Sequence, residues 1–128
     1  MNSRSKRRKF GQNYLKDKAV LFEMSSYINP KQNDSFVEIG PGRGALTEQI
    51  NKKNINILAV DIDEENISYL REKYNGPGNL KFVECDFLKF DLPRDSQSLR
   101  VVGNLPYNVS TQIILKLIND YQIIHDMH

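Results

Sequence analysis

The segment Ser35-Phe-Val-Glu-Ile-Gly-Pro-Gly-Arg-Gly-Ala45 decides the fold of this chain. Its first five residues include the aromatic and β-branched side chains that are typical of a strand. The glycines that follow allow a tight turn, and the next stretch places Leu46 and Ile50 on one face of a helix that runs to Lys53. The segment therefore predicts a strand, a glycine turn and a helix.

The rest of the chain continues this alternation of strands and helices. Further strands are predicted at residues 55–61, 80–85 and 99–103, and further helices at 20–28, 63–74 and 109–121. Asp63 is placed to cap the helix that follows it. Strands joined by helices of this length imply right-handed crossovers and a parallel sheet covered on both faces. We therefore predict an α/β, Rossmann-like fold with a sheet of about four strands.

Length and composition narrow the function classes. The chain has 128 residues, of which 39% are hydrophobic, enough for one core but not for two stable domains. It contains no apolar run long enough to span a membrane and no apolar segment typical of a secretory signal, so we expect a cytoplasmic protein. The single Cys85 cannot form an internal disulfide, and His125 and His128 lack metal-ligand spacing. We expect no metal site.

The charge is unevenly distributed along the chain. Residues 1–18 carry seven basic residues and one acid, a net charge of +6, whereas the remainder carries −4. We divide the chain into an arm, residues 1–16, and a domain, residues 17–128. A basic arm favours a nucleic-acid partner, since clustered cations release counterions from phosphates, although a solvated tail has the same composition. The residues predicted to contact RNA phosphates are Arg4, Lys6, Arg7, Arg8 and Lys9.

The ends of the first two strands carry residues that suit a nucleotide-like cofactor. Gly40 and Gly42 fit the dinucleotide fingerprint, in which the backbone approaches the ligand. Asp61 ends the next strand, where a carboxylate can accept hydrogen bonds from ribose hydroxyls. Both nicotinamide cofactors and S-adenosylmethionine (SAM) would use this pattern. Glu38 favours SAM, because its carboxylate would repel a pyrophosphate and attract the ammonium and sulfonium groups of SAM.

The third strand ends in Asp86 and Phe87. Asp86 could accept a hydrogen bond from the adenine amine of the cofactor, and Phe87 could pack against the adenine ring. A surface acid after a strand is the plainer interpretation of this pair. The presence of ligand-type residues at three consecutive strand ends favours the functional interpretation.

The fourth strand ends in Asn104-Leu-Pro-Tyr107, the most specific signal in the sequence. An adenine amine is a poor nucleophile because its lone pair is delocalised into the ring. Acceptors such as the Asn104 side-chain oxygen would favour the pyramidal amine that exposes this lone pair. Pro106 would stiffen the turn, and Tyr107 would offer a flat face for stacking a flipped base.

These segments together resemble the ribosomal RNA adenine N6,N6-dimethyltransferases of the kasugamycin-sensitivity type. The matching residues are 8–15, 37–47, Asp61, Asp86 and 104–110. The erythromycin-resistance methylases of large-subunit rRNA share this plan. The Phe10-Gly11 pair, the Gly-Pro-Gly turn and Asn108 favour the small-subunit group.

The resemblance implies SAM-dependent transfer of four methyl groups to two adjacent adenosines near the 3′ end of small-subunit rRNA, during ribosome biogenesis. It implies that Gln12, Asn13 and Leu15 close over the cofactor and that Gly40 and Gly42 line its methionine end, with Glu38 nearby. It further assigns the ribose to Asp61 and the cofactor adenine to Asp86. Asn104, Pro106 and Tyr107 would hold the target base, with Asn104 also near the cofactor. The partner would be small-subunit rRNA in a pre-30S particle.

The resemblance also implies later strands and a helical C-terminal domain that do not follow His128. We therefore expect the fourth strand to have an unpaired edge through which the chain could dimerise, and weak or absent methylation by this chain alone. Two alternatives remain from the sequence. One is a non-catalytic SAM- or RNA-binding fragment of such an enzyme, and the other is a nicotinamide-dependent oxidoreductase domain.

Overall fold

The structure, a computed structural model, describes residues 18–128 apart from 53, 77, 95–97, 106 and the side chains of 107–110. The described residues form one parallel sheet of five strands in the order β3-β2-β1-β4-β5. The strands are β1 (Ser35–Ile39), β2 (Asn56–Asp61), β3 (Leu80–Glu84), β4 (Leu99–Gly103) and β5 (Ile124–Met127). The predicted α/β class is confirmed, with one strand more than expected.

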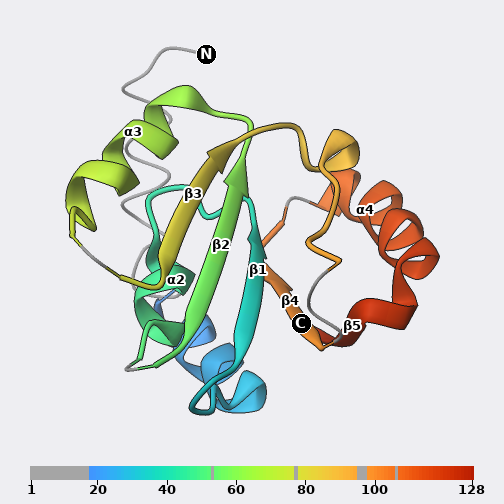
Figure 1. Cartoon of the computed structure of the whole chain (residues 1–128), viewed down its shortest axis with the longest axis horizontal. Helices are drawn as coiled ribbons and strands as arrows, with labels where there is room; N and C mark the ends of the chain where they lie inside the picture. The colour runs from blue at the N-terminus through green and yellow to red at the C-terminus, as the bar shows by residue number, and fades with distance from the viewer. Residues whose placement is uncertain (1–17, 53, 77, 95–97, 106) are drawn as a thin grey trace.

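Helices cover both faces of this sheet (Figure 1). A helix over residues 18–28, α2 (Ala45–Ile50) and α3 (Glu64–Lys73) lie on one face, and α4 (Tyr107–Asn119) lies on the other. The 3-10 turns η1 (Phe87–Lys89) and η2 (Tyr121–Ile123) flank α4. None of the helices in the described part of the chain is long and apolar enough to cross a membrane.

Strand β1 lies in the middle of the sheet and contributes to both cores. It pairs with β2 and β4, so that Glu38 lies beside Ala59 and Val102. Alternate side chains of a strand point to opposite faces. Phe36 accordingly packs in the core under α2 and α3, and Val37 packs in the core under α4. By the same alternation, Glu38 points toward the α2 side.

Helix α3 begins where the sequence predicts. The Asp63 carboxylate accepts hydrogen bonds from the backbone N–H groups of Glu65, at 2.9 Å, and Asn66, at 3.4 Å. These bonds satisfy donors that a helix N-terminus otherwise leaves unpaired. The predicted cap is confirmed, and it fixes the backbone just after the end of β2.

Strand β5 corrects the expectation of an open edge on β4. It pairs in parallel with β4, with Leu99 opposite Ile124 and Val101 opposite Met127. The pairing continues past β5, since the His128 N–H donates to the Val101 carbonyl at 2.8 Å. The prediction that the fourth strand is unpaired is therefore wrong, and so is the route to a dimer that depended on that edge.

The Arg100 network, defined here as Arg100 with Asp126, Asp34 and the carbonyls of Ile28 and Asn29, joins β4 to its surroundings. The guanidinium donates to both carboxylate oxygens of Asp126, each at 2.9 Å, and to Asp34 at 2.8 Å. It also donates to the Ile28 carbonyl and to the Asn29 carbonyl at 3.3 Å, at the end of the helix over residues 18–28. The network therefore connects β5, β4 and the first helix.

The charges of this network shift the pKa values of their own groups. The hydrogen bonds that Arg100 donates to Asp126 raise the pKa of Arg100 above its ordinary value, against the effect of burial. Burial alone would raise the pKa of Asp126, but the hydrogen bonds from Arg100 and His128 bring it below its ordinary value. Both groups are therefore charged at neutral pH. Sequence reasoning did not identify this network.

Candidate functional site

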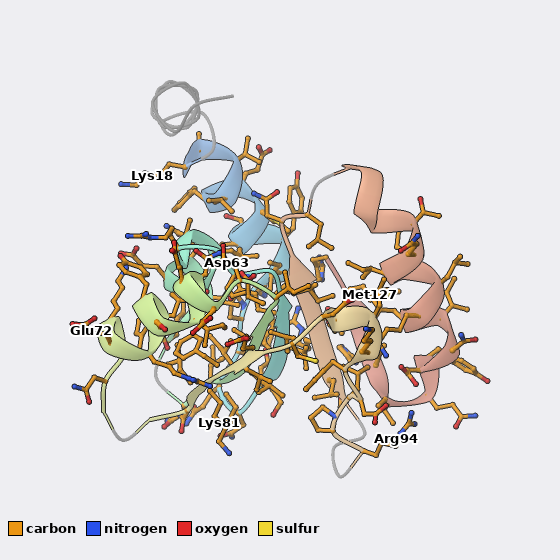
Figure 2. The ribbon with its side chains drawn as sticks, turned by 90° about the horizontal axis from the view of Figure 1, so that it is seen from above. Lys18, Asp63, Glu72, Lys81, Arg94 and Met127 are labelled. Atoms are coloured by element: carbon orange, nitrogen blue, oxygen red, sulfur yellow. The ribbon has the colours of Figure 1, made fainter. Side chains whose placement is uncertain are left out.

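A cavity of about 400 Å³ lies at the carboxyl end of β1, between the glycine turn and the first helix. We call it the Glu38 cavity. The residues that line it include Leu21, Glu38, Gly40, Gly42, Asn66 and Asn104. Four residues of the predicted site, from the first and fourth strand ends, are thus brought together. Figure 2 looks down on this end of the sheet, with Lys18 and Asp63 toward the α3 side and Met127 toward α4.

The glycine turn is built from three residues in the left-handed region of backbone space. Gly40, Gly42 and Gly44 have φ values of 64°, 59° and 89°. Gly44 favours glycine through its φ, and a β-carbon there would lie 2.8 Å from Cδ2 of Leu70, so that the Leu70 side chain on α3 would have to shift. The predicted fingerprint used Gly40 and Gly42, but gave no separate role to Gly44.

Asp61 connects the end of β2 to the glycine turn. Its Oδ2 accepts from the Gly42 N–H at 3.0 Å and from the Asn66 side-chain amide at 3.4 Å. Its Oδ1 accepts from the Asp63 N–H at 2.9 Å. The carboxylate is buried and held in a fixed orientation next to the Glu38 cavity. Each carboxylate oxygen can accept more than one hydrogen bond, so a ligand hydroxyl can still be accepted there.

Glu38 is a buried acid in a largely apolar setting. Its side chain is 1% exposed, its strand neighbours are Ala59 and Val102, and Thr47 Oγ1 donates to its Oε1 at 2.5 Å. Burial raises the pKa of Glu38 to about 7, although the Thr47 hydrogen bond lowers it and the Asp61 carboxylate raises it further. Near neutral pH this side chain exchanges between an acid and a carboxylate. Thr47 is a contributor that sequence reasoning missed.

Glu38 makes the stability of the fold depend on pH. Its pKa rises from 4.5 to about 7 on folding, so its stabilising effect is complete below pH 4.5 and is lost as the pH rises through 7. We expect the free energy of unfolding to fall by roughly 2 kcal/mol between pH 5.5 and 8, relative to a Glu38→Gln variant. Urea unfolding of both proteins across this range measures the difference. If the free energy of unfolding changed with pH equally in both proteins, Glu38 would not be the group responsible.

The third strand end lies next to Asp61 but does not line the Glu38 cavity. Asp86 accepts from the Leu88 N–H at 3.0 Å and caps η1. Phe87 is buried in the core under α4, with its ring centroid 6.2 Å from that of Phe90. The structure therefore gives Phe87 a packing role. The adenine contacts expected of Asp86 and Phe87 stay predictions.

The fourth strand end joins the Glu38 cavity to a second hollow. A groove of about 470 Å³ on the α4 side is lined by Asn104, Leu105, Ile113, Leu117, Met127 and His128, among others. Asn104 is the one described residue that lines both hollows. Leu105 packs over the glycine turn, since a β-carbon on Gly40 would lie 3.3 Å from its Cδ2. Asn104 therefore stands at the boundary between two adjoining spaces.

Several predicted site residues fall outside what the structure describes. Tyr107 is the first residue of α4, but its side chain is not among those described, and Pro106 is outside the described residues. The remaining residues in this group are Arg4, Lys6, Arg7, Arg8, Lys9, Gln12, Asn13 and Leu15. Their roles in binding RNA, cofactor and target base stay predictions.

Arg43 is a further cavity residue that sequence reasoning did not single out. It lies in the glycine turn, lines the Glu38 cavity and stacks its guanidinium carbon 3.8 Å from the centre of the Tyr69 ring. Such cation–π stacking on α3 restricts the direction of the side chain. The rim of the cavity therefore carries an oriented positive charge.

The chain matches known proteins over nearly its whole length. A family model described as "Ribosomal RNA adenine dimethylase" matches residues 3–128. Proteins named Ribosomal RNA small subunit methyltransferase A are similar to it, from Coxiella burnetii (strain RSA 493 / Nine Mile phase I) at 43% identity over 124 residues and from Pseudomonas fluorescens (strain Pf0-1) at 44% over 125. Each match covers 95% of this chain and, respectively, 48% and 46% of the relative. The chain spans about half the length of these relatives.

Solved structures show the same fold. The 23S rRNA methyltransferase ErmE superposes with a TM-score of 0.71 at 24% identity, over 83% of this chain and 42% of that one. A dimethyladenosine transferase from Plasmodium falciparum superposes with a TM-score of 0.66 at 30% identity, over 79% of this chain and 36% of that one. The predicted Rossmann-like methyltransferase fold is therefore confirmed.

Proposed function

This chain belongs to the ribosomal RNA adenine dimethylase family, and on that premise we propose that it forms the cofactor site and part of the base pocket of a small-subunit rRNA dimethyltransferase. The reaction is transfer of methyl groups from SAM to the N6 amines of two adjacent adenosines near the 3′ end of that rRNA. The setting is ribosome biogenesis in the cytoplasm, with the rRNA in a pre-30S particle.

The observation that carries this proposal is the position of Asn104 between the two hollows. The Glu38 cavity offers a buried acid and a glycine turn, which suit the charged methionine end of SAM. The groove on the other side of Asn104 has apolar walls from Leu105 and Leu117, which suit a flat base. SAM in the cavity, as methyl donor, and the target base in the groove, as methyl acceptor, would therefore meet at Asn104.

The residues contribute mainly by positioning the two reactants. SAM supplies an activated methyl group on its sulfonium sulfur. Asp61, fixed by Gly42 and Asp63, orients a ribose through its hydroxyls. The Asn104 side-chain oxygen accepts from the target amine and favours its pyramidal form, which directs the nitrogen lone pair toward the cavity. Holding reactants in this way accelerates an in-line displacement without a strong base or a covalent intermediate.

The Glu38 side chain disfavours a nicotinamide cofactor. Its carboxyl group can ionise beside the positive charges of SAM, but as a carboxylate it would repel a pyrophosphate placed at the glycine turn. Calorimetry with SAM and with NAD distinguishes a SAM-dependent methyltransferase from a nicotinamide-dependent oxidoreductase. SAM binding without NAD binding supports the methyltransferase, and the reverse contradicts it.

The non-catalytic alternative is supported by the share of the relatives that this chain covers. A chain that spans half of their length can hold the cofactor site without the complete substrate site. Transfer of tritiated methyl groups from SAM to immature small subunits tests this point. SAM binding without transfer would identify this chain as a cofactor-binding portion, and transfer by the chain alone would identify it as sufficient for catalysis.

Asp61→Ala is expected to weaken SAM binding by about 10- to 100-fold. The change removes hydrogen bonds to a charged acceptor and also releases the Gly42 N–H that Asp61 orders. Titration calorimetry measures the effect, with Asp61→Asn as the isosteric control that retains one acceptor oxygen. Unchanged SAM affinity in the alanine variant would remove Asp61 from the cofactor site.

The basic arm is expected to provide the salt dependence of RNA binding. Neutralising Arg4, Lys6, Arg7, Arg8 and Lys9 to Gln should flatten the plot of log affinity against log salt for a small-subunit rRNA fragment, because fewer counterions are released. The matched control neutralises five basic residues elsewhere, Lys31, Lys52, Lys81, Lys89 and Arg94. An equal loss of slope in this control would show that the arm has no special role.

A further inference from the structure

We propose that the Glu38 cavity binds SAM with release of a proton, because Glu38 changes from a carboxylic acid to a carboxylate when the cationic cofactor enters. The O–H bond of the acid breaks, its electron pair stays on the carboxylate, and the proton passes to solvent. This inference rests on the proposed function, since it assumes that SAM occupies this cavity. If it holds, the pH determines what fraction of the protein has SAM bound.

The geometry leaves Glu38 little stabilisation for a negative charge. The side chain points from β1 to the α2 side of the sheet, between Ala59 and Val102, and is 1% exposed. Thr47 donates one hydrogen bond to its carboxyl group. The side chain also lines the Glu38 cavity, so a ligand there contacts it directly. Without a positive charge nearby, a buried acid of this kind keeps its proton to a higher pH than an exposed one.

The other charged groups around Glu38 come from every neighbouring element. Asp61 of β2 and Glu48 of α2 are acids, and the former disfavours a second negative charge nearby. Lys18 and Arg43 are exposed at the rim, and Tyr74 ends α3. Among the residues that the structure describes, no basic side chain is within ion-pair distance of Glu38. The cofactor itself would supply the missing positive charge.

The inference predicts how strongly the affinity for each ligand depends on pH. SAM carries a sulfonium charge and an ammonium charge, whereas its demethylated product, S-adenosylhomocysteine, keeps only the ammonium. SAM should therefore release more protons than the product does. The preference for SAM over the product should increase as the pH rises from 6 to 8. In a site with this property, SAM displaces the spent cofactor most effectively under mildly alkaline conditions.

The experiment is titration calorimetry of SAM in pairs of buffers that differ in ionisation enthalpy, at pH 6, 7 and 8. The wild-type chain is expected to release close to one proton at pH 6, about half a proton at pH 7 and almost none at pH 8. Its affinity should be about tenfold higher at pH 8 than at pH 6. Glu38→Gln should release none and bind with a flat pH profile. Glu72→Gln, which changes an exposed acid of α3 that does not line the cavity, should behave as wild type.

A second variant keeps the test informative if Glu38→Gln does not fold. Thr47→Val removes the hydrogen bond that favours the carboxylate, so proton release at pH 7 should increase and the midpoint of the affinity profile should move to higher pH. SAM binding without proton release in the wild type, or unchanged release in Glu38→Gln, would overturn the inference while leaving the proposed function intact. Failure to bind SAM at every pH would instead overturn the proposed function.

Discussion

Asn104→Ala is expected to reduce methyl transfer by at least about 100-fold while SAM affinity changes by less than about twofold. Asn104 lines both the Glu38 cavity and the groove under α4, so its side-chain oxygen is placed to act on the acceptor amine at the boundary. Removing a single preorganised hydrogen-bonding group of this kind commonly costs about 10²–10³ in rate. The rate is measured with tritiated SAM and immature small subunits, in a polypeptide extended to the length of the curated relatives.

Asn66→Ala provides the matched control for this experiment. Asn66 lines the Glu38 cavity but not the groove, and its side-chain amide donates to Asp61 at 3.4 Å. We expect this variant to weaken SAM binding and to retain most of the rate at saturating SAM. Equal losses of rate and SAM affinity in Asn104→Ala would instead make Asn104 a cofactor-binding residue.

Arg100→Met is expected to destabilise the fold by about 3 kcal/mol, the lower end of the cost of breaking a buried ion pair, because the Asp34 and Asp126 carboxylates that lose their partner are half-buried. The change removes the bidentate bond to Asp126, the bond to Asp34 and the donors to the first helix. Since domains of this size are stable by only about 5–15 kcal/mol, the loss should be evident in urea unfolding. Arg100→Lys should recover part of it, because an ammonium cannot reproduce the planar fork.

Two other arginines serve as controls for Arg100. Arg94 forms an exposed ion pair with Asp120 at 3.0 Å, and Arg71 donates to the Phe82 carbonyl at 2.8 Å. Exposed pairs contribute less than about 1 kcal/mol, so Arg94→Met should leave the unfolding midpoint nearly unchanged. Arg71→Met should cost about 1 kcal/mol, as expected for one hydrogen bond. A loss as small as these in Arg100→Met would show that the network contributes little stability.

The sequence predicts the central part of the fold because local signals and packing agree there. The segment from Phe36 to Ile39, apolar except for Glu38, is typical of a strand buried on both faces, and it pairs on both sides in the sheet. The turn glycines predict backbone that the structure places in the left-handed region. Asp63 predicts the start of α3, and its side chain caps that helix.

Strand β5 escaped prediction because its stability comes from a partner strand. His125 and Asp126 interrupt its apolar pattern, and the segment has only four residues. Asp126 is nevertheless half-buried, because it lies opposite Arg100 in the neighbouring strand. A charged residue such as Arg100 or Asp126 does not by itself suggest a buried position. Pairing of β4 with β5 makes the burial of both possible, because it places the two opposite charges side by side. The register of β5 against β4 cannot be predicted from the local sequence pattern alone.

The candidate site shows the same division between local and long-range information. Glu38 lies near the end of β1, and Gly40, Gly42 and Asn104 follow strand ends closely, so the topology of a parallel sheet is sufficient to bring them together. Phe87 also follows a strand end, but the 3-10 turn η1 carries it into the core under α4. The role of Thr47 depends on the packing of α2 against β1, which no local pattern reveals.

The Arg100 network also sets an order of events during protein synthesis. The carbonyls of Ile28 and Asn29 bond to a side chain 72 and 71 positions later in the chain, and Asp126 lies 26 positions later still. The helix over residues 18–28 carries Lys18 and Leu21, which form one wall of the Glu38 cavity. A nascent chain grows from its N-terminus, so the bonds to this wall cannot form until Arg100 has left the ribosome, and Asp126 fixes Arg100 only later. We therefore expect the cofactor cavity to be among the last features to mature, after most of the sheet has already been made.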